Sequence, residues 1–347
     1  MKILITGSLG YVGSVLSKTL REEFPDAELV GYDAGFFARN LTSRLYAPEI
    51  LLDRQIYGDV RKFPADLLEG VDTVIQLAAI SNDPIGNKFE EVTFDVNHQA
   101  VVDIAKKAKE RGVKRVVFAS SCSVYGIAEE AARTENSDVN PLTAYAKSKV
   151  RAENDLQSLA DHTFMVTCLR FATACGMSDR LRLDLVLNDF VAGAYTSGEI
   201  TILSDGSPWR PLINVNDMAR AIIWGHEREP EQGGDFCLVN TGSNRWNYQV
   251  KELAYSVKQI LPDISVTINQ DALPDKRSYK VDFGLFEKLA PSRQPRFELE
   301  RTIKDLVEGL GNMGFKNKNF RESELIRLHV INQLVKDKIV DRNLYIH

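Results

Sequence analysis

Short apolar runs rich in β-branched residues alternate with helical patterns through the first half of the chain. The predicted strands are the runs at residues 2–6, 28–32, 55–57, 73–78, 115–119 and 163–169. The predicted helices are at about 11–23, 89–111 and 143–159, and Gly112 suits the C-terminal cap of the second helix. Strands that alternate with helices indicate βαβ crossovers, so we expect an α/β fold with a doubly wound parallel sheet.

The alternation becomes irregular after Arg170. The strand–helix pattern returns only at residues 211–224 and 236–240. The remaining pattern predicts a smaller α+β lobe, interleaved with the sheet, from a strand-like run at 264–268 and helical runs at 285–289 and 299–310.

Past Gly314, apolar positions between Leu325 and Val335 predict an amphipathic helix. The charges of this helix are mixed in sign. We therefore expect it to dock on the body of the protein or on a partner subunit, and not on a membrane surface.

Composition is that of an ordinary globular protein. The 347 residues are 44% hydrophobic and 26% charged, and 43 Lys+Arg against 48 Asp+Glu give a net charge of −5. No basic surplus favours nucleic acid as a partner, and no apolar run predicts a membrane span or a secretory signal. The four cysteines and five histidines show no disulfide or metal-binding spacing. We therefore expect a reduced, cytoplasmic, metal-free enzyme.

A glycine-rich motif follows the first predicted strand. Gly7, Gly10 and Gly13 form G-x-x-G-x-x-G where this strand passes into the first helix. The glycines allow a tight turn whose N–H groups approach a pyrophosphate, so the motif predicts a dinucleotide site. Asp33 ends the second strand, where a carboxylate accepts hydrogen bonds from the adenosine ribose and repels a 2′-phosphate. This favours NAD, although Arg39 nearby leaves NADP open.

Further polar and small residues lie at the carboxyl ends of later strands, the edge at which open α/β sheets bind ligands. They occupy positions 59–60, 78–79 and 120–123. In the helix that follows, Tyr145 and Lys149 are four residues apart on one face.

Taken in order, the strings TGSLGYVG, YDAG, GDV, LAAIS, FASSCSVYG and YAKSK resemble the extended short-chain dehydrogenase/reductase family. Within it, the chain is similar to the nucleotide-sugar epimerase/dehydratase branch, over about residues 1–310. The resemblance implies NAD as the cofactor, a nucleotide-diphosphate sugar as the substrate, and a homodimer formed through the helices at 89–111 and 143–159.

The resemblance also implies a division of the chain. A NAD-binding Rossmann domain would comprise residues 1–173 and about 211–240. The smaller interleaved α+β lobe, at about 174–210 and 241–314, would bind the nucleotide sugar, and 315–347 would form a C-terminal helical extension.

The same resemblance assigns roles to single residues. Tyr145 would be the catalytic acid/base, Lys149 its partner, and Ser121 the hydroxyl that holds the reacting oxygen. The implied cofactor-binding residues are Gly7, Gly10, Tyr11, Val12, Gly13, Asp33, Asp59, Val60, Leu77, Ala78, Ala79, Asn97, Tyr145 and Lys149. The implied substrate-binding residues are Ser121, Ser123, Tyr145, Thr173, Asn188, Arg210 and Arg277. Arg180 and Arg182 either face a ligand or begin a solvated helix.

The tyrosine needs help to act as a base, because a phenol with a pKa of about 10 stays protonated at neutral pH. Lowering that pKa by roughly 3 units requires about 4 kcal/mol of preference for the phenolate. The Lys149 ammonium and a positive nicotinamide ring are of the right magnitude to supply it. The phenolate would then take a proton from a sugar hydroxyl while hydride leaves the same carbon.

Departures from the family pattern narrow the reaction. The 4,6-dehydratases have Asp-Glu after the position of Ser121, whereas this chain has Cys122 and Ser123. The 3,5-epimerising branches have a cysteine where Ser123 stands, and we interpret Cys122 as a packed residue. Redox at one carbinol remains, so a 4-epimerase is the first hypothesis and a 4-dehydrogenase or 4-ketoreductase the alternative. A 4,6-dehydratase or a non-catalytic NAD(H)-binding regulator is less favoured.

Overall fold

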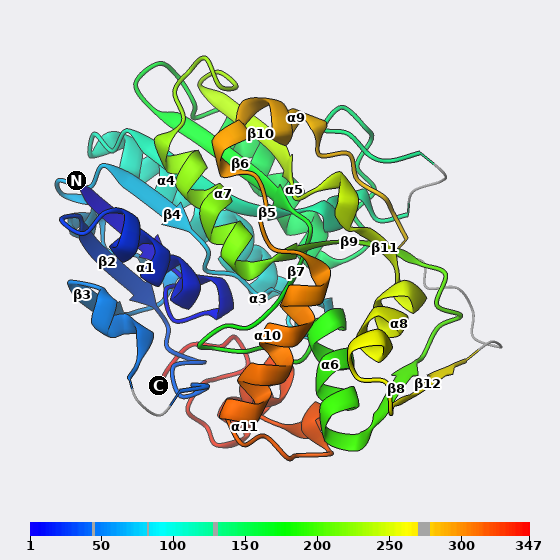
Figure 1. Cartoon of the computed structure of the whole chain (residues 1–347). Coiled ribbons are helices and arrows are strands. Elements are labelled where there is room, and N and C mark those ends of the chain that lie inside the picture. Colours follow the sequence, from blue (N-terminus) through cyan, green and yellow to red (C-terminus); the bar gives the residue numbers. More distant parts are fainter. Residues whose placement is uncertain (44–45, 82, 128–130, 270–277) are drawn as a thin grey trace.

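Parallel strands form the centre of the protein in the computed structural model, which describes residues 1–43, 46–81, 83–127, 131–269 and 278–347 (Figure 1). Every strand pair in this sheet is parallel, as the alternating pattern predicts. In spatial order, the strands are β3 (Arg54–Tyr57), β2 (Glu28–Asp33), β1 (Lys2–Thr6), β4 (Thr73–Gln76), β5 (Arg115–Ser121), β6 (Met165–Phe171) and β10 (Phe236–Thr241). The strand order reverses between β1 and β4, so the predicted doubly wound fold is confirmed.

Helices cover both faces of the sheet. On one face α1 (Tyr11–Glu23) packs against α7 (Val215–Glu227), and on the other lie α4 (Ala100–Glu110) and α5 (Ala144–Gln157). Side chains alternate along each strand accordingly: Ile3 and Ile5 join the core under α1, whereas Leu4 joins the core under α4. Because both faces are buried, the strands consist of nearly continuous apolar runs.

The helix predicted at 89–111 is one helical run with a wider turn inside it. α3 (Glu90–Phe94) continues through a π-helical turn at Asp95–Gln99 into α4. The buried Asn97 lies in that turn, and its amide pairs with the backbone N–H and C=O of Ile80 at 2.8 and 3.0 Å. The π turn therefore supports the loop that follows β4, and such turns are frequent at functional sites.

The second half of the chain is more regular than its pattern predicts. Two helices that the pattern does not reveal, α6 (Val186–Ser197) and α8 (Val250–Ile260), pack with α10 (Leu299–Asn312). Beside them lie two small sheets, β7 (Thr173–Cys175) with β9 (Trp209–Asn214) and β11 (Asn247–Gln249), and β8 (Glu199–Ile202) with β12 (Ser265–Ile268). One apolar core continues from α1 and α7 into these helices, and the domain limits given above stay a prediction.

The C-terminal segment turns back toward the cofactor half of the molecule. In Figure 1 the red end of the chain lies on the side of β2 and β3, below the blue N-terminal elements. Its helix α11 (Arg327–Lys336) contacts α2 (Asp83–Lys88), so the helix docks on the body of its own chain. The short helix α9 (Gly284–Leu289) packs on β10.

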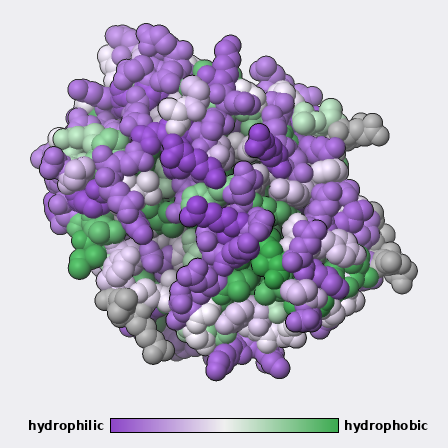
Figure 2. Space-filling model, in the orientation of Figure 1, coloured by the Kyte–Doolittle hydropathy of each residue, from purple (hydrophilic) through white to green (hydrophobic). Residues whose placement is uncertain are grey.

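The outer face shown in Figure 2 is mostly hydrophilic, with hydrophobic atoms in scattered patches. Among the described helices, none combines the length and the apolarity that a membrane crossing requires. The four cysteines, Cys122, Cys168, Cys175 and Cys237, are buried and free.

A buried ion pair joins α5 to β6 beneath the site. The Arg170 guanidinium donates to both carboxylate oxygens of Glu153, at 3.0 and 2.7 Å, and both side chains are almost fully buried. The Ser120 hydroxyl also donates to Glu153, and Arg170 donates to the Tyr125 hydroxyl at 3.1 Å. The network fixes the end of β5 relative to the helix that carries Tyr145 and Lys149.

We predict that Glu153→Leu destabilises the protein by about 3–5 kcal/mol, because it leaves the Arg170 charge buried without its partner. Urea denaturation measures this change in the free energy of unfolding. The control is Asp103→Asn, which removes an exposed pair with Lys107 four residues away and should cost less than about 0.5 kcal/mol. Equal losses in the two variants would contradict the structural role of the buried pair.

Candidate active site

A cavity of about 560 Å³ lies at the carboxyl ends of the strands, where the order reverses between β1 and β4. This is the crevice in which doubly wound folds bind ligands, and the volume suits a ligand pocket. The strand order arranges its walls: Asp33 and Asp59 at one end, the glycine-rich turn in the middle, and Ser121 with Tyr145 beyond β4.

The glycine-rich turn packs directly on the loop after β4. Gly7 has φ +78°, and a Cβ there would stand 2.6 Å from the backbone nitrogen of Ala78. A Cβ at Gly13 would stand 2.3 Å from the carbonyl oxygen of Gly7. Only glycine fits these positions, and the turn leads straight into the N-terminus of α1 at Tyr11. Gly10, Tyr11 and Val12 line the cavity there, and N–H groups at a helix N-terminus bind a pyrophosphate.

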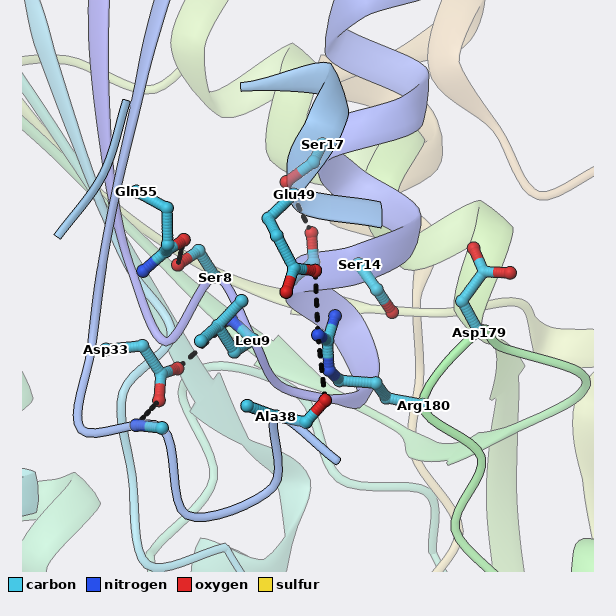
Figure 3. Close-up of polar contacts among 12 residues, drawn as sticks. Ser8, Leu9, Ser14, Ser17, Asp33, Ala38, Glu49, Gln55, Asp179 and Arg180 are labelled. Carbon is cyan, nitrogen blue, oxygen red and sulfur yellow. Dashed lines mark hydrogen bonds and ion pairs between the residues drawn. The ribbon is translucent and has the colours of Figure 1, made fainter. Parts of the chain in front are cut away.

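Asp33 lines the cavity at the end of β2. Its carboxylate accepts hydrogen bonds from the backbone N–H groups of Leu9 at 3.1 Å and Gly35 at 2.7 Å (Figure 3). Burial raises the pKa of this carboxyl, and the two hydrogen bonds oppose that rise. Arg39, which left NADP open, is exposed and does not line the cavity.

Asp59 and Val60 line the same end of the cavity as Asp33. The Asp59 carboxylate accepts a hydrogen bond from the backbone N–H of Arg61 at 2.9 Å and pairs with the Arg61 guanidinium. Leu77, Ala78 and Ala79 continue this wall after β4.

The structure brings Ser121, Tyr145 and Lys149 together on the wall beyond β4. The Ser121 hydroxyl is hydrogen-bonded to the Tyr145 phenol and accepts from the backbone N–H of Ser123 at 3.2 Å. The buried Lys149 ammonium donates to the carbonyl of Ala119 at 2.7 Å and lies 5.7 Å from the centroid of the Tyr145 ring. Burial lowers the pKa of Lys149 to about 7, and Glu153 opposes that shift.

Burial and neighbouring side chains set the pKa of the Tyr145 phenol. Burial raises the pKa of the phenol, and Asp83 raises it further, whereas the hydrogen bond from Ser121 and the charge of Arg182 lower it. Arg182 is buried in the cavity wall, where it donates to Asp184 at 2.9 Å and to the Ser81 hydroxyl at 3.0 Å. The sequence leaves open whether Arg182 faces a ligand or solvent, and the structure places it in the cavity wall.

Cys122 points into the core. Its thiol donates to the carbonyl oxygen of Arg170 at 3.0 Å, and burial raises its pKa. The interpretation of Cys122 as a packed residue therefore agrees with its surroundings. Ser123 lines the cavity, and its hydroxyl has no hydrogen-bond partner among the residues that the structure describes.

Comparison with known proteins identifies the family. Residues 3–238 match the sequence profile of the NAD dependent epimerase/dehydratase family. The chain belongs to this family. Its cofactor is therefore NAD.

Relatives within this family differ in activity. An N-acetyl-α-D-glucosaminyl-diphospho-ditrans,octacis-undecaprenol 4-epimerase of Escherichia coli O157:H7 is 33% identical over 267 residues, 76% of this chain and 74% of the relative. UDP-glucuronic acid decarboxylase 6 of Arabidopsis thaliana is 26% identical over 294 residues, 82% of this chain and 81% of the relative. The solved structure of MoeE5 in complex with UDP-glucose and NAD has 25% identity and a TM-score of 0.74, and the match covers 90% of this chain and 99% of MoeE5.

The cavity of this epimerase/dehydratase family member fits a dinucleotide. The turn at Gly7 and Gly13 leaves room for a pyrophosphate against backbone N–H groups, and Asp33 lies where an adenosine ribose needs an acceptor. Asn97, expected in the helix behind the site, does not line the cavity: its amide is fully buried on the Ile80 backbone, so it supports the β4 loop from behind.

Some of the residues expected to bind the substrate line the cavity, and others do not. Thr173 and Arg210 line the cavity with Ser123, and the pattern did not reveal Tyr279, which lines it as well. Asn188 is a correction, because its buried amide bonds the backbone of Gly176 and Arg182 and does not line the cavity. Arg277 lies outside the described residues.

We predict that the protein prefers NAD to NADP and that Asp33→Asn narrows the preference. The amide keeps the shape of the side chain and removes the charge that repels a 2′-phosphate. Calorimetry on cofactor-stripped protein compares the two dissociation constants. Equal or tighter NADP binding by the unsubstituted protein would contradict the assigned role of Asp33.

We also predict that Ser121→Ala raises the pKa of Tyr145, because the hydroxyl hydrogen bond favours the phenolate. NMR of isotope-labelled tyrosine, assigned by comparison with Tyr145→Phe, follows the ionisation. Ser123→Ala is the matched control. A titration curve that Ser121→Ala leaves unmoved would show that the hydroxyl does not influence the phenol.

Proposed function

We propose that this protein is a nucleotide-sugar 4-epimerase. The observation that carries the proposal is the environment of Cys122 next to Ser121 and Tyr145. In 4,6-dehydratases the two residues after the serine remove water, but here the Cys122 thiol faces the Arg170 carbonyl and Ser123 offers only a hydroxyl. The proton-transfer pair Ser121 and Tyr145 is intact. These groups support reversible redox at one carbinol without elimination.

Tyr145 is the proposed acid/base and Ser121 the hydroxyl that orients the reacting oxygen. NAD, when bound, supplies a reversible acceptor for the hydride of C4. Tyr145 as phenolate takes the proton from the C4 hydroxyl and later returns it to the 4-keto oxygen. Between the two transfers the 4-keto sugar must rotate, so that the hydride returns to the opposite face of C4. The sugar then leaves with only its C4 configuration changed.

The charges around Tyr145 suit that role. Arg182, which is buried in the cavity wall, lowers the pKa of the phenol. The Lys149 side chain, held by the Ala119 carbonyl, is the second cation that favours the phenolate when it carries its proton.

A nucleotide-diphosphate sugar is the proposed substrate, and Ser123, Thr173 and Arg210 are its proposed contacts. The relationship to MoeE5, whose structure holds UDP-glucose and NAD, supports this substrate class. The homodimer and the cytoplasmic location stay predictions.

A 4-dehydrogenase or 4-ketoreductase remains the alternative, since the same Ser121 and Tyr145 suffice for one-way redox. The difference lies in whether the 4-keto sugar leaves the protein. An epimerase returns hydride to the sugar, so reduced cofactor does not accumulate, whereas a dehydrogenase releases a keto sugar and leaves NADH.

The deciding experiment incubates the purified protein with UDP-, GDP-, dTDP- and CDP-sugars, without added oxidant, and follows products by NMR and the bound nicotinamide by absorbance. We expect a C4-inverted sugar and no net NADH. Stoichiometric NADH with a released 4-keto sugar would overturn the epimerase in favour of the alternative.

For the sugar that reacts, we predict that Tyr145→Phe lowers turnover by about 100- to 10,000-fold, because the variant loses its proton acceptor. Binding of NAD and of the nucleotide sugar should change little. A variant that keeps most of its turnover would show that another group transfers the proton.

A further inference from the structure

The segment 325–345 forms a wall of the cofactor cavity. Arg327, Ile331 and Leu344 line this cavity, together with Phe36 and Phe37 from the loop after β2. Ile331 and Leu344 are nearly fully buried in an apolar cluster with residues from the loop after β4 and from α2 and α3. This wall lines the same cavity as the glycine-rich turn, and nothing in the sequence pattern assigned it to the cofactor.

Arg61 fixes the end of this segment to the cavity. Its guanidinium donates to the carbonyl oxygens of Asn343 at 2.6 Å and Leu344 at 3.1 Å and lies 3.6 Å from the centroid of the Tyr345 ring. The same guanidinium pairs with Asp59 at the cavity wall. One side chain therefore ties the segment to the end of the cavity that Asp59 and Val60 form.

Arg327 is the charged residue of this wall. It is only 2% exposed, its Nη2 donates to the carbonyl oxygen of Arg180 at 2.8 Å, and its guanidinium carbon lies 4.3 Å from the centroid of the Phe37 ring. Its Nη1 is buried and has no hydrogen-bond partner among the described residues. Leaving such a group unpaired in a buried position is costly.

The charges that face Arg327 leave it short of negative partners. Burial lowers the pKa of its guanidinium to about 9, and the positive charges of Arg182 and Arg180 lower it further. Asp184 and Asp33 oppose this shift, but Asp184 already pairs with Arg182, and Asp33 accepts from two backbone N–H groups. Arg180 is itself paired with Glu49, as Figure 3 shows. A bound anion would supply a negative partner for Arg327.

The position of Arg327 identifies which part of a dinucleotide it faces. Arg327 interacts electrostatically with Asp33, which marks the adenosine ribose, and with Arg182, which influences Tyr145 at the reacting end. The pyrophosphate of a dinucleotide lies between these two ends, at the helix N-terminus. The neighbouring Asp33 carboxylate disfavours a 2′-phosphate at the same place.

We infer that Arg327 binds the pyrophosphate of NAD through its free Nη1, and that residues 325–345 form a strap which closes over the bound cofactor. The inference goes beyond the proposed reaction and does not depend on it, because it concerns NAD alone. Arg327 of this strap supplies the positive charge that the glycine-rich turn does not carry.

The test is the affinity of the full-length, cofactor-stripped protein for NAD, ADP-ribose, NADP and adenosine, measured by calorimetry. Arg327→Gln should weaken NAD and ADP-ribose by about 10- to 100-fold, the loss typical of a hydrogen bond to a charged group. Adenosine, which has no phosphate, should bind as before. The matched control is Arg321→Gln, which removes an arginine just before the strap that pairs with Asp189 and does not line the cavity.

Three results would overturn the inference. They are unchanged NAD affinity in folded Arg327→Gln, an equal loss for adenosine, which would mean that the residue only supports the Phe37 wall, and a loss confined to NADP. If the variant does not fold, hydrogen exchange on the unsubstituted protein decides. NAD should then protect backbone amides in 327–345, and unchanged exchange in this segment would overturn the strap.

Discussion

The close approach of Gly7 to the backbone at Leu77 and Ala78 is the constraint on which the rest of the cavity depends. It brings the turn after β1 against the loop after β4. The strand order reverses between these two neighbouring strands, so the segments that follow them line one crevice. β1 and β4 pair in parallel with Thr6 opposite Gln76, so the two strands end side by side. Ser121, at the end of β5, then lies one strand beyond β4, where it lines the same cavity.

The chemistry follows from how charge is distributed around that crevice. Glu153 and Arg170 neutralise each other, whereas the Lys149 ammonium lies 5.7 Å from the centroid of the Tyr145 ring. The charge of Arg182 and the hydrogen bond to Ser121 both lower the pKa of the Tyr145 phenol. In the proposed reaction these groups move one proton, and the Cys122 thiol, which bonds the Arg170 carbonyl in the core, supplies no second acid or base.

The sequence predicts the first half of the fold well because each strand there is buried on both faces and each helix has one apolar side. The limits of β1 and α1 agree with the structure residue for residue. The sequence pattern does not reveal α6. This helix is buried on nearly all sides, so its apolar residues show no helical period. Gly193, where an added Cβ would meet the Glu199 carbonyl, also suggests a break in the helix. The π turn at Asn97 escapes it too, since one extra residue in a helical turn has no compositional signal.

Among the candidate site residues, sequence reasoning works where a motif fixes the backbone and fails where a contact is long-range. Asn188 follows a family position but turns its amide to Gly176, and Arg327 reaches the cavity from the other end of the chain. A signal for Arg327 does exist. It stands four residues before Ile331, so the predicted amphipathic helix carries a charge on its apolar face, and such a charge requires a partner.

The rates at which the four buried cysteines react with an added reagent report local opening of the fold. Each thiol has a raised pKa because of burial, so the reactive thiolate is scarce while the chain stays closed. An alkylating reagent can therefore modify them only during local opening. Cys122 is the informative one, because it adjoins Ser121: its rate of alkylation reports how frequently the catalytic edge of β5 separates from the core, whatever sugar the protein is turning over.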